Sequence, residues 1–229
     1  MEGSYLIVCE GASEANYLTL LTRLLQTLPP PECLKGYSLR FNLPQLEGAS
    51  LDTKSEYAGR CVGSGRYIHL KKAWQKARKD NAGVDIHVWA DWDLYERNDW
   101  NCLTDYMAKP KGIPDFHFSF QNFEDFWAMH LEDGIFQTWL NLMTSKNHWT
   151  TPLHSDGPNG YLPLFQRLVS GYEKGELKLE DLTVERLNNM RRHIPDVQAL
   201  RAQTLPISFH LFAEFLSQTL NWFYPEVFP

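Results

Sequence analysis

Three acidic residues stand at the ends of two predicted strands. Glu10 follows the apolar run at residues 5–9, and Asp91 and Asp93 follow the strand predicted at residues 85–90. A continuous apolar run of this length is typical of a strand buried on both faces of a parallel sheet. Because ligands bind beyond the carboxyl ends of such strands, we expect these three carboxylates to converge on one site.

Grouped carboxylates favour a hard divalent cation. Mg²⁺ takes oxygen ligands, keeps several waters, and is commonly held by one or two carboxylates together with substrate phosphate. Glu10, Asp91 and Asp93 are therefore the predicted metal ligands, with Mg²⁺ as the expected cofactor and Mn²⁺ as the alternative ion. The bound ion would neutralise charge developing on a phosphate and orient the attacking group. Glu10 is also a candidate general acid or base if burial raises its pKa.

Glu124 lies just beyond a third predicted strand, at residues 115–120. A single acid in such a place is usually a turn residue or a helix cap, and a cap is the alternative role for Glu124. Acids at three strand ends are much less expected by chance than an acid at one. We therefore count Glu124 among the candidate catalytic residues.

Two further stretches are candidates for binding substrate phosphate. The segment Gly63-Ser64-Gly65-Arg66 precedes a predicted helix, so its backbone N–H groups and Arg66 could cradle a phosphate. It lacks a Walker pattern, and a plain flexible loop is the alternative. Lys71 and Lys72 begin the basic face of the next helix, which could contact a nucleic-acid backbone or simply face solvent. The predicted substrate-binding residues are Ser64, Arg66, Lys71 and Lys72.

The elements that must position these residues alternate between strands and helices. Strands are expected at residues 5–9, 39–43, 85–90 and 115–120, and helices after Ser13 as N-cap, at 67–81, at 100–107 and from Asn122. This alternation predicts an α/β fold, with a mostly parallel, Rossmann-like sheet and flanking helices. Beyond residue 147 the pattern indicates helices at 161–172, 183–192 and 208–222. We expect a catalytic domain over residues 1–146 and a helical extension over 147–229 packed on it.

Composition limits the classes of protein that the chain can belong to. With 229 residues, 43% hydrophobic and 22% charged, it is typical of a globular protein. Its 22 Lys and Arg against 28 Asp and Glu, a net charge of −6, fit poorly with binding nucleic acid by charge alone. The four cysteines form no CxxC pair, and no signal peptide or apolar run of about 20 residues is seen. We expect reduced thiols, a cytoplasmic location and no membrane span.

Three stretches in order, LIVCEGASEANYL, HVWADWD and SFQNFEDFWAMHL, resemble the RloB-like family of the TOPRIM fold. The resemblance covers roughly residues 4–132, and the family's Asn-Pro-Cys-Phe-Glu is shortened here to Gln121-Asn122-Phe123-Glu124. The matching positions are Glu10, Gly11, Ser13, Glu14, Asn16, Tyr17, Asp91, Asp93, Phe123, Glu124, Trp127 and His130. The resemblance implies a TOPRIM-like centre with Glu10 as acid or base and Asp91 and Asp93 as metal ligands. Glu14 joins Glu10 and Glu124 as a candidate catalytic residue.

The resemblance also implies a function. The chain is expected to be a Mg²⁺-dependent nuclease that hydrolyses DNA or RNA, including tRNA, as the effector of a bacterial anti-phage defence system with an ATPase partner. The alternative is a non-catalytic TOPRIM-like module that docks on an ATPase and senses nucleic acid or nucleotide. The choice among DNA, RNA and tRNA, and the oligomeric state, stay open at this point.

Overall fold

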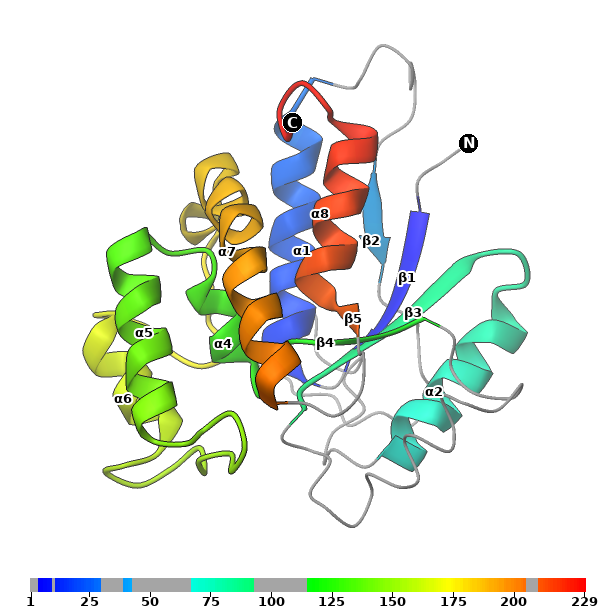
Figure 1. The fold of residues 1–229 in the computed structure, drawn as a ribbon. Coiled ribbons are helices and arrows are strands. Elements are labelled where there is room, and N and C mark those ends of the chain that lie inside the picture. The colour runs from blue at the N-terminus through cyan, green and yellow to red at the C-terminus, as the bar shows by residue number, and fades with distance from the viewer. Residues whose placement is uncertain (1–3, 10, 30–38, 43–66, 93–114, 205–209) are drawn as a thin grey trace.

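A parallel five-stranded sheet organises the chain. A computed structural model describes residues 4–9, 11–29, 39–42, 67–92, 115–204 and 210–229. The strands lie in the order β2-β1-β3-β4-β5, and every neighbouring pair is parallel (Figure 1). Their bounds are Ser4–Cys9 (β1), Arg40–Asn42 (β2), Asp85–Ala90 (β3), Phe116–Phe118 (β4) and His210–Leu211 (β5).

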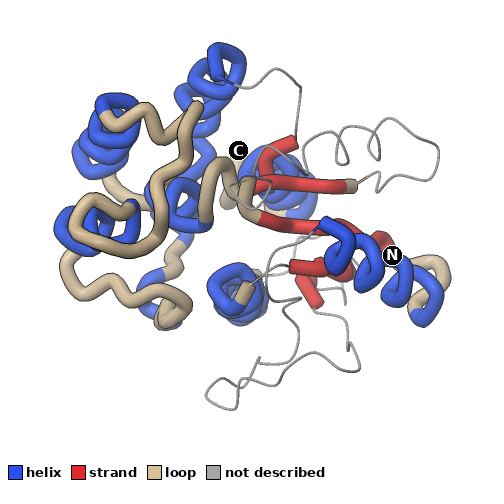
Figure 2. Tube along the Cα trace, turned by 90° about the horizontal axis from the view of Figure 1, so that it is seen from below, coloured by secondary structure: helices blue, strands red, loops and turns tan. Residues whose placement is uncertain are grey.

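Helices cover both faces of the sheet. Among the described helices, α2 alone lies on one side of the strands, and the others lie on the opposite side (Figure 2). Figure 1 places α1 beside α8, and α4 to α7 as a group lateral to the sheet. The helices are α1 (Ala12–Thr27), α2 (Tyr67–Asp80), α4 (Phe123–Ala128), α5 (Asp133–Ser145), α6 (Tyr161–Leu168), α7 (Val184–Thr204) and α8 (Phe212–Phe223), with the 3-10 turn η2 (Leu179–Asp181).

The strand order creates a switch point at the carboxyl edge of the sheet. Cys9 of β1 pairs with Trp89 of β3, and Trp89 pairs with His117 of β4, so the carboxyl ends of these strands lie along one edge. β1 has β2 on one side and β3 on the other, so the chain winds outward in both directions from the β1–β3 pair. In open α/β sheets the crevice at such a point is the usual ligand site.

The core consists of two apolar layers, one on each face of the sheet. Leu6, Val8 and Val88 pack against α2, whereas the alternate residues Ile7 and Trp89 belong to the larger cluster that includes α1 and α8. This alternation follows from the period of two along a strand. Burial on both faces explains why β1 and β3 are almost continuously apolar in sequence.

The structure confirms the α/β class and the parallel sheet, and it corrects several details, among them the end of α7, which runs to Thr204 and not to residue 192. The N-cap of α1 is Gly11 and not Ser13. The stretch predicted as helix from residue 208 contributes β5 before α8 begins, so the C-terminal part adds a strand to the sheet. The helix α5 was not predicted, and α6 ends at Leu168, four residues before the predicted end. The helix predicted at residues 100–107 lies outside the described residues.

None of the described helices combines the length and apolarity that crossing a bilayer requires. The thiol of Cys9 is buried and donates a hydrogen bond of 3.8 Å to the carbonyl of Gly11, and the expectation of reduced cysteines stays a prediction. Cys33, Cys61 and Cys102 lie outside the described residues.

A pair of buried histidines joins two strands of the sheet. Nδ1 of His87 lies 2.9 Å from Nε2 of His117, and Nδ1 of His117 has no hydrogen-bond partner among the described residues. Burial lowers the pKa of His87, and the nearby carboxylates of Asp115 and Asp85 partly oppose this shift. Burial lowers the pKa of His117 further, and the neighbouring His87 and His210 add to that shift. Both rings are therefore neutral in the folded protein near neutral pH.

These histidines make the fold sensitive to acid. Because their folded pKa values lie below the unfolded value of 6.5, the unfolded chain binds more protons, and stability is lost as pH falls below about 6.5. We predict that His117→Phe reduces the slope of unfolding free energy against pH by up to about 1.4 kcal/mol per pH unit. Denaturant unfolding between about pH 5 and pH 7.5 measures this. The exposed control His154→Gln should keep the wild-type slope, and an unchanged slope in His117→Phe would refute the assignment.

Candidate active site

The start of α1 buries a glutamate at the carboxyl edge of the sheet. The carboxylate of Glu14 folds back toward the end of β1, and its Oε2 accepts a hydrogen bond of 3.1 Å from the backbone N–H of Gly11. Glu14 is only 2% exposed. A Cβ at position 11 would lie 2.8 Å from that oxygen, so a residue without a side chain allows the close approach. Gly11 thus allows the Glu14 carboxylate to pack against the backbone at the end of β1.

The turn between β4 and α4 has a strained backbone. Phe120 has a φ of 129°, a conformation that residues with side chains rarely adopt and that costs about 1–3 kcal/mol. Its carbonyl accepts a hydrogen bond of 3.0 Å from Trp92 N, which ties the turn to the end of β3. Asn122 then caps α4 by accepting from Asp125 N. The strained turn therefore fixes where α4 begins relative to β3.

Glu124 is fully buried in the first turn of α4 and does not cap it. Its Oε1 accepts a hydrogen bond of 3.0 Å from the hydroxyl of Tyr172. Its Oε2 is buried and has no hydrogen-bond partner among the described residues. Asn122 and Asp125 provide the reciprocal cap instead, so the helix-cap role considered for Glu124 is wrong. A buried carboxylate oxygen without a partner is costly and is typical of a functional position.

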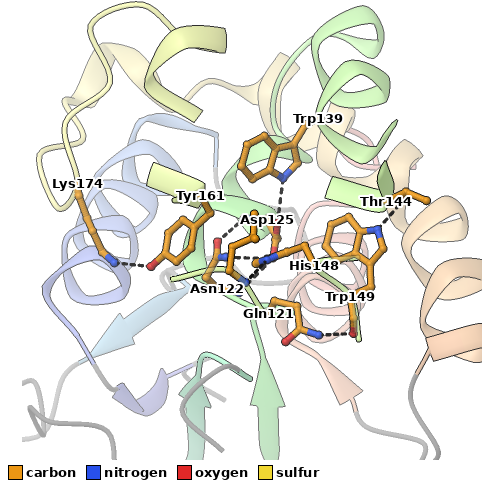
Figure 3. Close-up of polar contacts among 10 residues, drawn as sticks. Gln121, Asn122, Asp125, Trp139, Thr144, His148, Trp149, Tyr161 and Lys174 are labelled. Carbon is orange, nitrogen blue, oxygen red and sulfur yellow. Dashed lines mark hydrogen bonds and ion pairs between the residues drawn. The ribbon is translucent and has the colours of Figure 1, made fainter. Parts of the chain in front are cut away.

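The segment between α6 and η2 brings a cation to these carboxylates. Lys174 interacts electrostatically with both Glu14 and Glu124, and its Nζ donates a hydrogen bond of 2.8 Å to the hydroxyl of Tyr161 (Figure 3). The segment is held from α1, because Asn16 Nδ2 donates to the carbonyls of Gly175 and Leu177 at 3.1 and 3.0 Å. Asn16, one of the residues in the family resemblance, thus has a structural role.

Burial sets the charge state of the acidic pair formed by Glu14 and Glu124. Burial raises the pKa of Glu14 from 4.5 to about 7; the charge of Glu124 adds to the rise, and hydrogen bonds and Lys174 oppose it. Burial also raises the pKa of Glu124, which Lys174 and the Tyr172 hydrogen bond oppose. Near neutral pH the pair can therefore take up or release a proton. Two interacting buried carboxyls of this kind are the arrangement used for general acid–base chemistry.

A buried polar network behind the acidic pair holds α4 in place. Asp125 Oδ1 accepts a hydrogen bond of 2.9 Å from Trp139 Nε1, and its Oδ2 lies 3.4 Å from Nε2 of His148. Nδ1 of His148 accepts from Leu153 N at 2.9 Å. Figure 3 shows these side chains converging from α5 and the loop after it onto the start of α4. These contacts fix the position of α4 and therefore of Glu124. The carboxylate of Glu124 itself takes no part in them.

Of the three predicted metal ligands, the structure describes Asp91. Asp91 is 8% exposed and lies directly after β3, at the expected edge. Glu10 and Asp93 lie outside the described residues, so the expected convergence of Glu10, Asp91 and Asp93 stays a prediction. In the part of the chain that the structure describes, no three His, Cys, Asp or Glu side chains form a group that could hold a metal.

The structure describes two of the four predicted substrate-binding residues, and both lie on a helix that does not contribute to the acidic pair. Ser64 and Arg66 are outside the described residues. Lys71 and Lys72 lie in the first half of α2, on the face of the sheet opposite α1, and Lys72 is exposed. Because a tight turn joins α2 to the start of β3, the helix runs antiparallel to that strand, and its first turns return toward the carboxyl edge.

Comparisons with protein-family models, curated proteins and solved structures gave no match to this chain. The RloB-like and TOPRIM assignments therefore stay predictions that rest on the residues quoted for them.

Residues that sequence reasoning missed complete the site. Tyr172 and Lys174 lie about 50 residues beyond Glu124 in the chain, and no strand end or motif marks them. The local signal is the short stretch GYEKG, which places an aromatic and a lysine between Gly171 and Gly175, both with positive φ. His130, one of the positions in the family resemblance, is fully buried, with Nε2 2.8 Å from the hydroxyl of Tyr17.

The raised pKa of Glu14 has a measurable cost in stability. A folded pKa of about 7 against 4.5 in the unfolded chain means that stability is complete below about pH 4.5 and is lost as pH rises through 7. We predict that Glu14→Gln, without divalent cations, is more stable than wild type at about pH 8 by up to roughly 3 kcal/mol. The gain should vanish near pH 4.

Thermal or denaturant unfolding across this pH range measures the difference. Glu173→Gln changes an exposed glutamate of the neighbouring segment and should show no such pH-dependent gain. A Glu14→Gln variant that is equally destabilised at both pH values would show that folding does not shift the pKa of Glu14.

Proposed function

We propose that the chain is a Mg²⁺-dependent phosphodiester hydrolase that cuts nucleic acid. The observation that carries the proposal is the buried pair Glu14 and Glu124 at the switch point of the sheet. Burial raises the pKa of Glu14 to about 7, and one oxygen of Glu124 has no hydrogen-bond partner among the described residues. Hydrolysis of a phosphodiester uses proton transfer by a group that titrates near neutral pH. The carboxyl edge of a parallel sheet is the usual place for a bound ligand.

Each acidic residue has a distinct part in the proposed site. Glu10, Asp91 and Asp93 would hold the metal ion, and Asp91 supports this because it is buried directly after β3. A hard cation suits this set of oxygen donors, and when bound it supplies charge neutralisation at the phosphate. Glu14 and Glu124 take up or release the proton, with Glu124 held by Tyr172. Lys71, Lys72, Ser64 and Arg66 would bind the substrate backbone.

The biological setting follows from the family resemblance alone. We propose an effector of bacterial anti-phage defence that acts in the cytoplasm with an ATPase partner. The net charge of −6 supports a need for such a partner, because an acidic chain binds a polyanion weakly without added cationic surface.

One observation favours the non-catalytic alternative. Lys174 already lowers the pKa of both Glu14 and Glu124, so the chain itself provides a cation for this pair. A module that senses nucleic acid or nucleotide without cutting it could keep the acidic pair permanently neutralised in this way. The two functions differ in whether a divalent cation produces cleavage.

Removing two predicted metal ligands separates these functions. We predict that the double variant Asp91→Ala with Asp93→Ala folds normally and loses Mg²⁺-dependent cleavage of labelled DNA or RNA pools by a factor of about 100 or more. Relief of repulsion between neighbouring acids should leave stability unchanged or higher. Gel analysis with and without Mg²⁺ measures cleavage, and circular dichroism checks the fold.

The matched control is Asp85→Ala with Asp115→Ala. It removes the same charge from exposed acids at the amino-terminal ends of β3 and β4, so it should cleave as wild type does. Full activity in the Asp91 and Asp93 variant would contradict the metal-dependent mechanism. No Mg²⁺-dependent cleavage by wild type, alone or with an ATPase partner, would favour the sensing module.

A further inference from the structure

The acidic pair is covered by a short segment that carries its own positive charge. The segment Gly171–Gly175 places Tyr172 on Glu124 and Lys174 beside both carboxylates. Glu14 and Glu124 are 2% and 0% exposed, whereas Lys174 is exposed. An exposed lysine therefore interacts electrostatically with two buried carboxylates.

The segment is anchored by Tyr172, which is 7% exposed and packs against the ring of Phe165, and side-chain hydrogen bonds hold it elsewhere. Asn16 holds the carbonyls of Gly175 and Leu177, the Tyr172 hydroxyl holds Glu124, and the Lys174 ammonium holds the Tyr161 hydroxyl. Gly171 and Gly175 have φ values of 79° and 81°, a conformation that glycine adopts readily. A Cβ at Gly171 would meet open space. Glu173 and Lys174 are exposed, so this part of the segment can change conformation while Tyr172 stays in the core.

Charge explains why Lys174 and a divalent cation compete. Glu124 presents a buried oxygen without a hydrogen-bond partner among the described residues, and Glu14 adds a second carboxyl nearby. In the metal-free protein, the ammonium of Lys174 partly neutralises this negative charge. A divalent cation at the same edge carries twice the charge and repels the ammonium, so both cannot be bound with full strength.

We propose that Lys174 is a tethered counter-cation of the Glu14 and Glu124 pair, and that a divalent cation displaces it and frees the exposed part of the segment at Glu173 and Lys174. The inference rests on the proposed function, because it assigns the regulation of the same site. In the absence of metal the lysine keeps the acidic pair covered. Metal binding releases the ammonium to solvent, on the side from which an anionic substrate approaches.

Mn²⁺ affinity tests the competition. Isothermal titration with Mn²⁺ should show that Lys174→Gln binds the ion about threefold or more tighter than wild type, because a competing charge is gone. Lys174→Arg keeps the charge and should bind as wild type does. Lys178→Gln removes an exposed lysine close by in the chain and should also match wild type. Circular dichroism confirms that each variant is folded.

Limited trypsin digestion tests the release of this exposed part in wild-type protein. Cleavage after Lys174 should accelerate on addition of Mn²⁺ toward the rate in Asn16→Ala, a variant that lacks the two hydrogen bonds holding the segment. If wild type binds Mn²⁺ but Lys174→Gln binds it equally or more weakly, or if cleavage does not change, the inference is overturned and the proposed function stands. If wild type binds no Mn²⁺, both are overturned.

Discussion

The burial of two glutamates beneath one segment of chain is the constraint on which the site depends. A buried carboxylate loses its hydration and is stable only if it is protonated, hydrogen-bonded or paired with a cation. The chain uses all three: the pKa of Glu14 rises to about 7, Glu124 accepts from Tyr172, and Lys174 lies beside both. The positions of α1, α4 and the segment after α6 are therefore linked through the charge of this pair.

The surrounding structure supports the acidic pair from three directions. The parallel register of β1 and β3 brings the starts of α1 and α4 to one edge. Two features fix the position of α4: the strained turn at Phe120, and the network of Asp125, Trp139 and His148. Because Asn122 caps this helix, the carboxylate of Glu124 is left to contact Tyr172. This support costs conformational energy, and stored strain of this kind clusters at functional sites.

The fold could be predicted largely from local patterns, whereas the site could be predicted only in part. Apolar runs gave β1 and β3 because both faces of those strands are buried, and β3 was predicted with its observed bounds. β5 has two residues and merges into α8, too short for a period of two to be recognised. Glu124 was found because it follows a strand.

Contacts across long stretches of chain could not be predicted. The hydrogen bond from Tyr172 to Glu124 spans 48 residues, and those from Asn16 to Gly175 and Leu177 span 159 and 161 residues. Such contacts depend on how helices pack laterally to the sheet, which hydrophobic periodicity does not determine. The N-cap of α1 was misplaced for a local reason: the Glu14 carboxylate accepts a hydrogen bond from Gly11 N–H, three residues earlier, and makes a hydroxyl cap unnecessary.

The central claim is that Glu14 is a buried acid whose charge responds to a cation at the carboxyl edge of the sheet. Carbon-13 NMR of glutamate side-chain carboxyls, with Glu14→Gln used to assign the resonance, follows its titration directly. The account predicts a pKa of about 7 in the metal-free protein and a fall when Mg²⁺ is added, because a nearby positive charge favours the carboxylate. A pKa near 4.5 that Mg²⁺ does not change would contradict it.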